Sequence, residues 1–359
     1  MSLAVMGIGS VNACGSGIDK FESVLKGKSV PHITEKAVET SSGKIRFNVF
    51  SPIIEGLDSF IEARKIRRLD DLARMVLLSS FLAVEDSGIE IDDRSRVGVI
   101  FGSAHGPLKT TFGFLDSLID FGDGNASPTN FANSVHNSLA SQISIFLNIT
   151  GPTTTITCFN HTVGNVFTMA ENWLKNNYVD YVIAGIGDEY CDVLGYGFIN
   201  TIEKVQASID PFAYNKCSFL PGEGSVSFLL SKDDSDSGKY GSIRKIYTRR
   251  NIKEKSIPEG YDALFISSHG NRNHVSVFGN IDFDISKMRA YSPYYGSMDT
   301  GAAFEIAAAL LSNRDRIIYK SPLDPPGIKT RDIKLDKNIK IGCMEYCKKD
   351  EYNLYEISN

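Results

Sequence analysis

The sequence predicts an α/β fold, built either as one large unit or as two fused units. Short apolar strands alternate with helical patterns along most of the 359 residues, and a chain of this length exceeds a usual single domain. Segments 96–106 and 262–271 each place an apolar strand before a Ser- and Ala-containing turn that carries His-Gly. This similarity suggests a duplicated unit without establishing one.

A tight corner at residues 158–161 organises the chain. The β-branched run 153–157 before it is typical of a buried strand, and the pattern from Thr162 onward places apolar residues at helical spacing. A corner of this kind holds its side chains at a helix N-terminus, where backbone N–H groups and the helix dipole favour developing negative charge. Many enzymes keep a nucleophile in such a position.

The remaining elements of the first half follow from apolar patterning. Residues 26–65 are mixed in pattern and give no assignment. We expect strands at 3–11, 96–101, 153–157, 181–187 and 225–230, helices at 18–25, 69–87 and 131–147, and an amphipathic segment at 110–121.

In the second half, the segment 300–311 is apolar almost all round, so we expect a helix that is covered on every side. The charged, small-residue run 232–241 has the composition of an exposed linker, and it divides the chain into halves 1–232 and 233–359. Strands are expected at 243–247, 263–267, 288–291, 317–319 and 340–344.

Composition excludes several classes of protein. The formal net charge of −5 with mixed signs gives no broad basic field, which argues against nucleic-acid binding. The six cysteines are scattered, and Cys343 and Cys347 fit core thiols better than a zinc site. No apolar run reaches the roughly eighteen residues of a membrane span, and no basic leader is seen. We expect a soluble cytoplasmic protein without a metal.

The stretches 151–157, 179–189 and 210–231 resemble the β-ketoacyl synthases, which are thiolase-fold condensing enzymes. The resemblance implies two pseudo-symmetric βαβαβαββ halves that form an α-β-α-β-α layered sandwich. In that family the acyl-accepting cysteine lies nine residues after the glycine of a Gly-Pro pair, and nine after Gly151 is Asn160. Counting back from the strand at 179 reaches Asn160 again.

Other catalytic positions of the family are also changed. The resemblance implies that His269 keeps the first histidine, whereas Ser297 stands at the second histidine and Ser292 at the lysine. The glycine-rich segment near the family's C-terminus is replaced by residues 341–346. Because an amide cannot be acylated as a thiolate can, condensation through Asn160 is excluded.

A ketosynthase-like chain with an amide at this position resembles the chain-length factor of type II polyketide synthases, although that subunit has glutamine there. The resemblance implies a heterodimer with an active ketosynthase, with the strand at 153–157 paired antiparallel to its counterpart. It also implies an interfacial tunnel for the growing polyketide, which is carried by an acyl carrier protein bearing phosphopantetheine; this chain holds no cofactor of its own. The tunnel candidates are Leu108, Thr111, Phe112, Leu115, Phe131 and His136.

Alternatives remain open. The chain could be a divergent condensing or decarboxylating enzyme that acts on carrier-protein substrates with His269 and Asn160, or a homodimer that binds acyl chains without chemistry. The tunnel candidates could be plain core residues. His105, His136 and His161 could each have either of two roles: a structural one, or contact with a polyketide.

Overall fold

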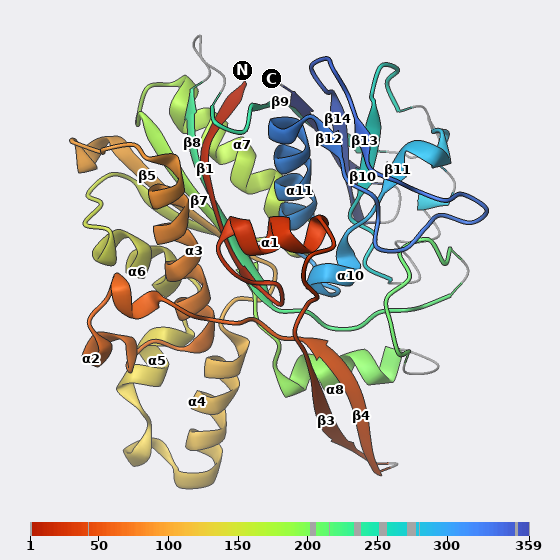
Figure 1. The fold of residues 1–359 in the computed structure, drawn as a ribbon. Coiled ribbons are helices and arrows are strands. Elements are labelled where there is room, and N and C mark those ends of the chain that lie inside the picture. The colour runs from red at the N-terminus through yellow and green to blue at the C-terminus, as the bar shows by residue number, and fades with distance from the viewer. Residues whose placement is uncertain are drawn as a thin grey trace.

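The main sheet of the computed structural model contains two runs of five strands (Figure 1). The structure describes residues 2–358 apart from residues 42, 202–205, 215, 233–237, 251–256, 271–277, 280 and 349–350. The first run has the order β6-β5-β7-β8-β1 and the second has the order β11-β10-β14-β15-β9.

The two runs match in direction as well as in order. The first contains β1 (Leu3–Asn12), β5 (Val97–Ser103), β6 (Thr153–Thr157), β7 (Tyr181–Asp188) and β8 (Gly224–Lys232). The second contains β9 (Ser242–Arg250), β10 (Ala263–Ile266), β11 (Met288–Arg289), β14 (Ile341–Lys348) and β15 (Glu351–Ser358). In each run two parallel pairs are followed by two antiparallel pairs. This repeated topology confirms the predicted thiolase-like α/β fold.

The runs are joined into one sheet by a short pairing of β1 with β9, in which Leu3 faces Ile243 and Ala4 faces Ser242. The boundary predicted between residues 232 and 233 stays a prediction, and residues 233–237 of its linker lie outside the described residues.

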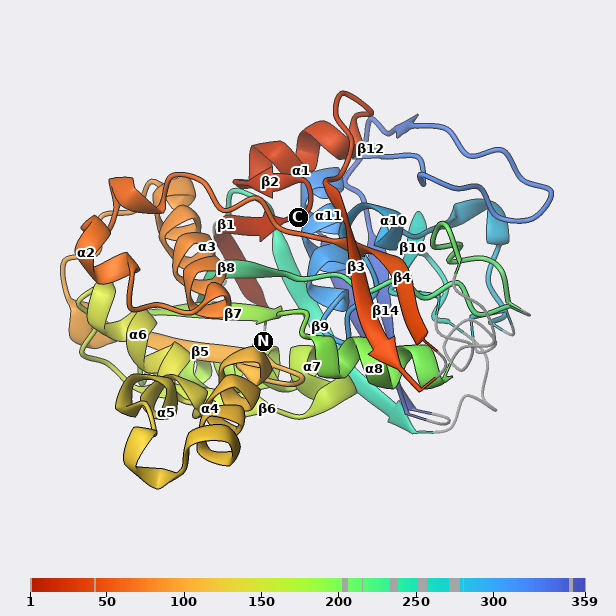
Figure 2. The ribbon, with the colours of Figure 1, turned by 90° about the horizontal axis from the view of Figure 1, so that it is seen from below.

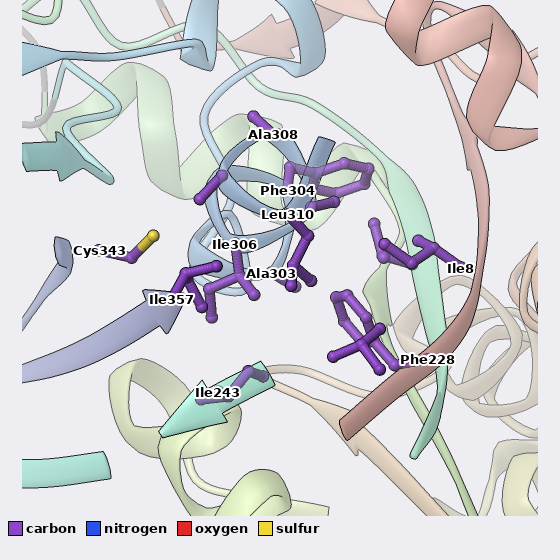
Figure 3. Packing of buried hydrophobic residues seen from close by; sticks show 14 of the residues in the cluster. Ile8, Phe228, Ile243, Ala303, Phe304, Ile306, Ala308, Leu310, Cys343 and Ile357 are labelled. Carbon is purple, nitrogen blue, oxygen red and sulfur yellow. The ribbon is translucent and has the colours of Figure 1, made fainter. Parts of the chain in front are cut away.

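Two helices fill the centre of the molecule: α7 (Thr162–Lys175) and α11 (Ala302–Asp315). Residues 302–313 of α11 are all buried, as predicted for a helix without a polar face. Figure 3 shows Ile8 and Phe228 of the first half and Ile243 and Ile357 of the second half around α11. The two halves therefore share one core.

Helix α7 approaches β5 closely because Gly102 has no side chain. A Cβ there would lie 2.5 Å from Val166 Cγ2 and 2.9 Å from Thr162 Cγ2. On the other face of the first run lies α3 (Asp71–Ser87), which packs on β1 and β8. Asp70 caps α3 by accepting a 2.7 Å hydrogen bond from the Ala73 N–H, and Gly88 ends it with φ 64°.

Three helices between β5 and β6 lie at one end of the molecule (Figure 2): α4 (Leu108–Phe121), α5 (Pro128–Ser134) and α6 (Ser138–Phe146). The prediction of a single helix at 131–147 is wrong. Val135 has an extended backbone, with φ −80° and ψ 135°, and this conformation separates α5 from α6.

Several elements were not predicted. Strands β3 (Ile33–Thr40) and β4 (Gly43–Phe50) form a separate hairpin that packs on α8 (Asp192–Thr201), and β15 was missed. The predicted strand at 317–319 is β12 (Ile317–Ile318), which pairs with β13 (Ile333–Lys334) away from the main sheet. The remaining short elements are β2 (Gly15–Ser16), α1 (Ile18–Leu25), α2 (Ala63–Ile66) and α10 (Ser292–Tyr295).

None of the helices in the described residues combines the length and the apolar character needed to cross a bilayer.

Candidate functional site

The corner between β6 and α7 is a turn of 3-10 helix, Phe159–His161. Asn160 is half-buried there, and its side-chain Nδ2 donates a hydrogen bond to the backbone carbonyl of Cys347 in β14. The side chain of Asn160 thus donates a hydrogen bond to the second half of the chain.

A second contact ties the corner to the same hairpin. His161 Nε2 lies 3.2 Å from Glu351 Oε2 at the start of β15. In the first turn of α7, a Cβ on Gly164 would lie 2.6 Å from Asn353 Nδ2, so the helix packs closely on β15. The corner is therefore fixed against β14 and β15.

Phe159 stands out at this corner. Its φ of 41° lies in the left-handed region, which is unusual for a bulky side chain, and its side chain is 62% exposed. The ring makes an edge contact with the His105 ring at a centroid distance of 5.4 Å. Sequence reasoning missed Phe159, because neither its backbone conformation nor its exposure can be inferred from the neighbouring residues.

His105 follows β5 and reaches the second half of the chain. Its Nε2 lies 2.8 Å from Asp299 Oδ2. Burial opposes the charged imidazolium, but the hydrogen bond to Asp299 and the charges of Asp188 and Asp299 raise the pKa of His105 above its usual value. This imidazole beside Phe159 is therefore more readily protonated than a free histidine.

Asp188, at the end of β7, joins the same turn to α11. Its carboxylate accepts hydrogen bonds from Ser103 Oγ (2.6 Å), the Ala104 N–H (2.9 Å) and Thr300 Oγ1 (2.8 Å). Burial raises the pKa of Asp188. The position of Asp188, an acidic residue at the end of an apolar strand, could have marked it in the sequence, but the sequence analysis did not identify it.

His269, Ser292 and Ser297, which the resemblance aligns with the family's other catalytic positions, lie around the loop 267–270 and α10. His269 is buried, its ring lies 5.8 Å from that of Phe219, and burial lowers its pKa. Ser297 Oγ donates to the His269 carbonyl, and Ser292 Oγ donates to the Ser268 carbonyl at 2.6 Å. Both serine hydroxyls thus bind the backbone of this loop.

The segment 341–346 lies in β14 and places Glu345 in the interior. Its Oε2 accepts hydrogen bonds from Tyr355 OH (2.6 Å) and Asn353 Nδ2 (3.0 Å), and burial raises its pKa to about 7. Residues 341–346 therefore form a regular strand with a buried acid.

The tunnel candidates gather on α4, on α5 and just after them. Leu108, Thr111 and Phe112 are half-buried, whereas Leu115 is 42% exposed and Phe131 is 58% exposed. The side chain of His136 is exposed and lies against Gly106. A Cβ atom on Gly106 would lie 2.3 Å from Cδ2 of the His136 ring. Neither α4 nor α5 contains a buried residue. These helices present apolar side chains that the chain itself does not cover.

A cavity of about 660 Å³ lies between α2, α5 and α6. Arg64, Lys65 and Arg68 line one side of it, and Leu69 and Phe146 are among its apolar lining residues. Glu62 pairs with Arg64 at 2.7 Å and lies 3.9 Å from Lys65. In the described part of the chain, no three His, Cys, Asp or Glu side chains gather closely enough to hold a metal ion.

Comparison with known proteins places these observations in context. Residues 2–235 match the family described as "Beta-ketoacyl synthase, N-terminal domain". The 3-oxoacyl-[acyl-carrier-protein] synthase 2 of Coxiella burnetii is 26% identical over 247 residues, which cover 64% of this chain and 58% of that protein. The enzyme of the same name from Vibrio cholerae is 22% identical over 257 residues, covering 67% and 60%. The chain thus spans about three-fifths of the length of these relatives.

Two solved structures share the fold over nearly the whole chain. "The ishigamide ketosynthase/chain length factor" has a TM-score of 0.81 at 14% identity and covers 100% of this chain and 99% of that chain. The complex "AntDE:AntF (apo): type II PKS acyl-carrier protein in complex with its ketosynthase bound to the hexaketide" has a TM-score of 0.75 at 14% identity, with 99% of each chain covered. At this identity the likeness establishes the fold alone.

Proposed function

Because the chain belongs to the β-ketoacyl synthase family, we propose that it is a non-catalytic chain-length factor. In this role it forms a heterodimer with an active ketosynthase of a type II polyketide synthase and shapes the tunnel for the growing polyketide. The observation that carries the proposal is Asn160, an amide at the family's nucleophile position that hydrogen-bonds to the Cys347 carbonyl.

The chemistry of Asn160 supports the loss of condensation. Acyl transfer in this family needs a thiolate, and an amide nitrogen, whose lone pair is delocalised, is not a comparable nucleophile. The hydroxyls of Ser292 and Ser297 bind backbone carbonyls and supply neither the charge of a lysine nor the ring of a histidine.

A partner subunit is supported by the surface that the chain leaves uncovered. Strand β6 lies at the end of the sheet and carries no charged residue, so its free edge can accept another strand. Among the described residues, seven of the thirteen exposed large apolar side chains lie between 115 and 159. They are Leu115, Ile119, Phe121, Phe131, Val135, Ile145 and Phe159. Such a concentration favours a protein interface.

The basic side of the cavity fits the acyl carrier protein as the second partner. The phosphopantetheine of a carrier protein contributes a phosphate, which guanidinium groups bind well. Reversing two charges, Arg64→Glu with Arg68→Glu, should weaken carrier binding to the heterodimer by about tenfold, since surface contacts of roughly 0.7 kcal/mol each sum to that change. Arg46→Glu, on the β3–β4 hairpin, is the matched control. If the double variant bound the carrier protein as tightly as the wild type does, the carrier protein would bind at another surface.

Co-expression tests the subunit role. The chain expressed with an active ketosynthase that has an intact Cys-His-His set should elute as a heterodimer. The complex should make polyketide, and labelled acyl groups should be found only on the ketosynthase. A stable homodimer of this chain that ignores the ketosynthase would overturn the proposal.

A second candidate function is decarboxylation of a malonyl-carrier protein by a divergent enzyme. The observation that favours it is the His105–Asp299 pair beside the corner, whose imidazole can hold a proton. Release of carbon dioxide from malonyl-carrier protein by the purified chain alone would establish this activity and exclude the non-catalytic role.

A further inference from the structure

We propose that Phe159 is the side chain against which the growing polyketide stops. This inference rests on the proposed heterodimer and names the residue that sets product length. Phe159 immediately follows Cys158 at the end of β6, the free-edge strand, so the corner lies where the interface with the ketosynthase is proposed.

Two features of Phe159 are unfavourable in the isolated chain. A phenyl ring that is 62% exposed leaves apolar surface in water, and φ of 41° strains the backbone of a residue with a bulky side chain. Among the described non-glycine residues with positive φ, the others are Asn148, Asn177 and Arg316, which are polar. An exposed, strained phenylalanine at this corner indicates that its side chain has a function in the complex that it does not have in the isolated chain.

The surrounding contacts fix the backbone of the corner that carries Phe159. On its C-terminal side, Asn160 bonds to the Cys347 carbonyl and His161 pairs with Glu351. On its N-terminal side, the Cys158 N–H donates to Thr162 Oγ1 at 3.1 Å. The corner is thus fixed at both ends, and the Phe159 ring itself rests against His105 on one side.

His105 links Phe159 to the tunnel candidates. The His105 ring contacts Phe159 on one side and is held by Asp299 on the other. The next residue, Gly106, lies against His136, and α4 with Leu108 begins two residues later. Phe159 and two of the tunnel candidates, Leu108 and His136, therefore lie next to the same turn, residues 103–106.

The chemistry of the ring suits a passive stop. A polyketide thioester is electrophilic, and a phenyl group offers no nucleophile that could trap it. A rigid apolar ring in a close-packed tunnel instead penalises a chain that is too long, because further growth must displace it. Asn160 then has a structural use: its amide helps to fix the stop.

Products of the reconstituted heterodimer test the inference, with its carrier protein and malonyl substrate supplied and product masses measured. Phe159→Ala should shift the products to chains longer by at least one ketide unit, and Phe159→Trp should shift them to shorter chains. Phe159→Gly, which also relieves the backbone strain, should lengthen them as Phe159→Ala does. Tyr178→Ala, at an aromatic side chain that is 64% exposed and lies outside the proposed interface, is the matched control and should leave them unchanged.

Association measured by size-exclusion chromatography separates the two proposals. If the wild-type chain does not associate with the ketosynthase, the proposed function itself fails. If the Phe159 variants associate but give wild-type products, the stop is another residue and this inference is wrong. If neither Phe159→Ala nor Phe159→Gly associates, Phe159 anchors the interface, and the inference is again wrong.

Discussion

Buried carboxyl groups with neutral hydrogen-bond donors are a recurring feature of individual residues in this chain. Glu305 Oε1, in α11, accepts hydrogen bonds from the Tyr291 N–H (2.7 Å) and Tyr295 OH (2.8 Å), and burial raises its pKa to about 8. Burial likewise raises the pKa of Glu189 to about 8 and that of Glu345 to about 7. Near pH 7, Glu305 and Glu189 are therefore largely protonated in the folded chain, and Glu345 is about half protonated.

Folding stability should therefore fall as the pH rises through this range. The usual pKa of glutamate is 4.5, whereas that of folded Glu305 is about 8. Above pH 4.5 the unfolded chain releases this proton while the folded chain keeps it, so the stabilisation decreases until about pH 8. Over the interval from pH 4.5 to about pH 8, the free energy of unfolding falls by an amount of the order of a few kcal/mol.

Glu305→Gln should flatten this dependence, because the amide keeps the shape and an acceptor oxygen but carries no titrating proton. Denaturant midpoints at pH 5.5 and pH 8.0, followed by the fluorescence of Trp173, the single tryptophan, measure the change. The variant should lose less stability than the wild type between these pH values. Glu39→Gln, at an exposed side chain, is the control. Equal slopes for wild type and Glu305→Gln would refute the assignment.

Asn160→Cys should not restore condensation, since Ser292 and Ser297 are unchanged and supply no lysine or second histidine. It should also lose the hydrogen bond to the Cys347 carbonyl, at about 1 kcal/mol of unfolding free energy. Asn160→Asp should cost more, about 1–3 kcal/mol, because it turns an acceptor toward that carbonyl. Denaturant unfolding and mass spectrometry after incubation with acyl-carrier protein measure both effects. Condensation by Asn160→Cys would contradict the loss of the whole site.

Helices α4 and α5 have no buried residue, and they expose large apolar side chains such as Leu115 and Phe131, which a partner is expected to cover. Phe131→Arg should abolish heterodimer formation while leaving the unfolding midpoint of the free chain nearly unchanged, since the side chain is already 58% exposed. Its main intramolecular contact is a ring contact with Phe114 at 5.5 Å. Val30→Arg, at an 84% exposed position, is the control. If Phe131→Arg associated with the ketosynthase as well as the wild type does, α5 would not be part of the interface.

Elements with a strong local pattern could be predicted from the sequence. Strands β1, β5, β7 and β8, the helix α3 and the apolar helix α11 lie close to their expected positions, because burial on one or all faces leaves a clear periodicity. Strand β6 also lies where it was expected, but the prediction that it is buried is wrong, because its residues at the edge of the sheet are exposed or half-buried. Strand β15 and the β3–β4 hairpin were missed, since their alternation is interrupted by charged and polar residues. The break between α5 and α6 depends on the backbone of Val135, which no apolar pattern records.

The candidate site was predictable only where a motif marks it. Counting within the motif placed Asn160 at the corner, but its contact with Cys347 joins residues 187 positions apart. The His105–Asp299 pair spans 194 positions. Such contacts arise from the way the two halves pack, so the sequence could supply candidate positions but not the network that connects them.

At the scale of the whole molecule, the two halves depend on each other. One hydrophobic cluster includes Ile8 and Phe228 from the first half with Ile243 and Ile357 from the second, all around α11 (Figure 3). The hydrogen bonds of Asp188 with Thr300 and of Asn160 with Cys347 cross the same division. A similar strand order in each half therefore does not imply independent folding.

Residues 1–232 expressed without the rest of the chain should consequently aggregate or remain partly unfolded. Removing α11 and β9 would expose the inner faces of β8 and α7, which are almost entirely buried in the full chain. At about 25 cal/mol per Å² of apolar surface exposed, the free energy lost would exceed the unfolding free energy of an ordinary domain. The full chain should unfold in one transition when Trp173 fluorescence and far-UV circular dichroism are compared. The fragment should show no cooperative transition, whereas co-expression with residues 233–359 should restore one. A soluble fragment with a sharp transition of its own would show that the first half is an autonomous domain.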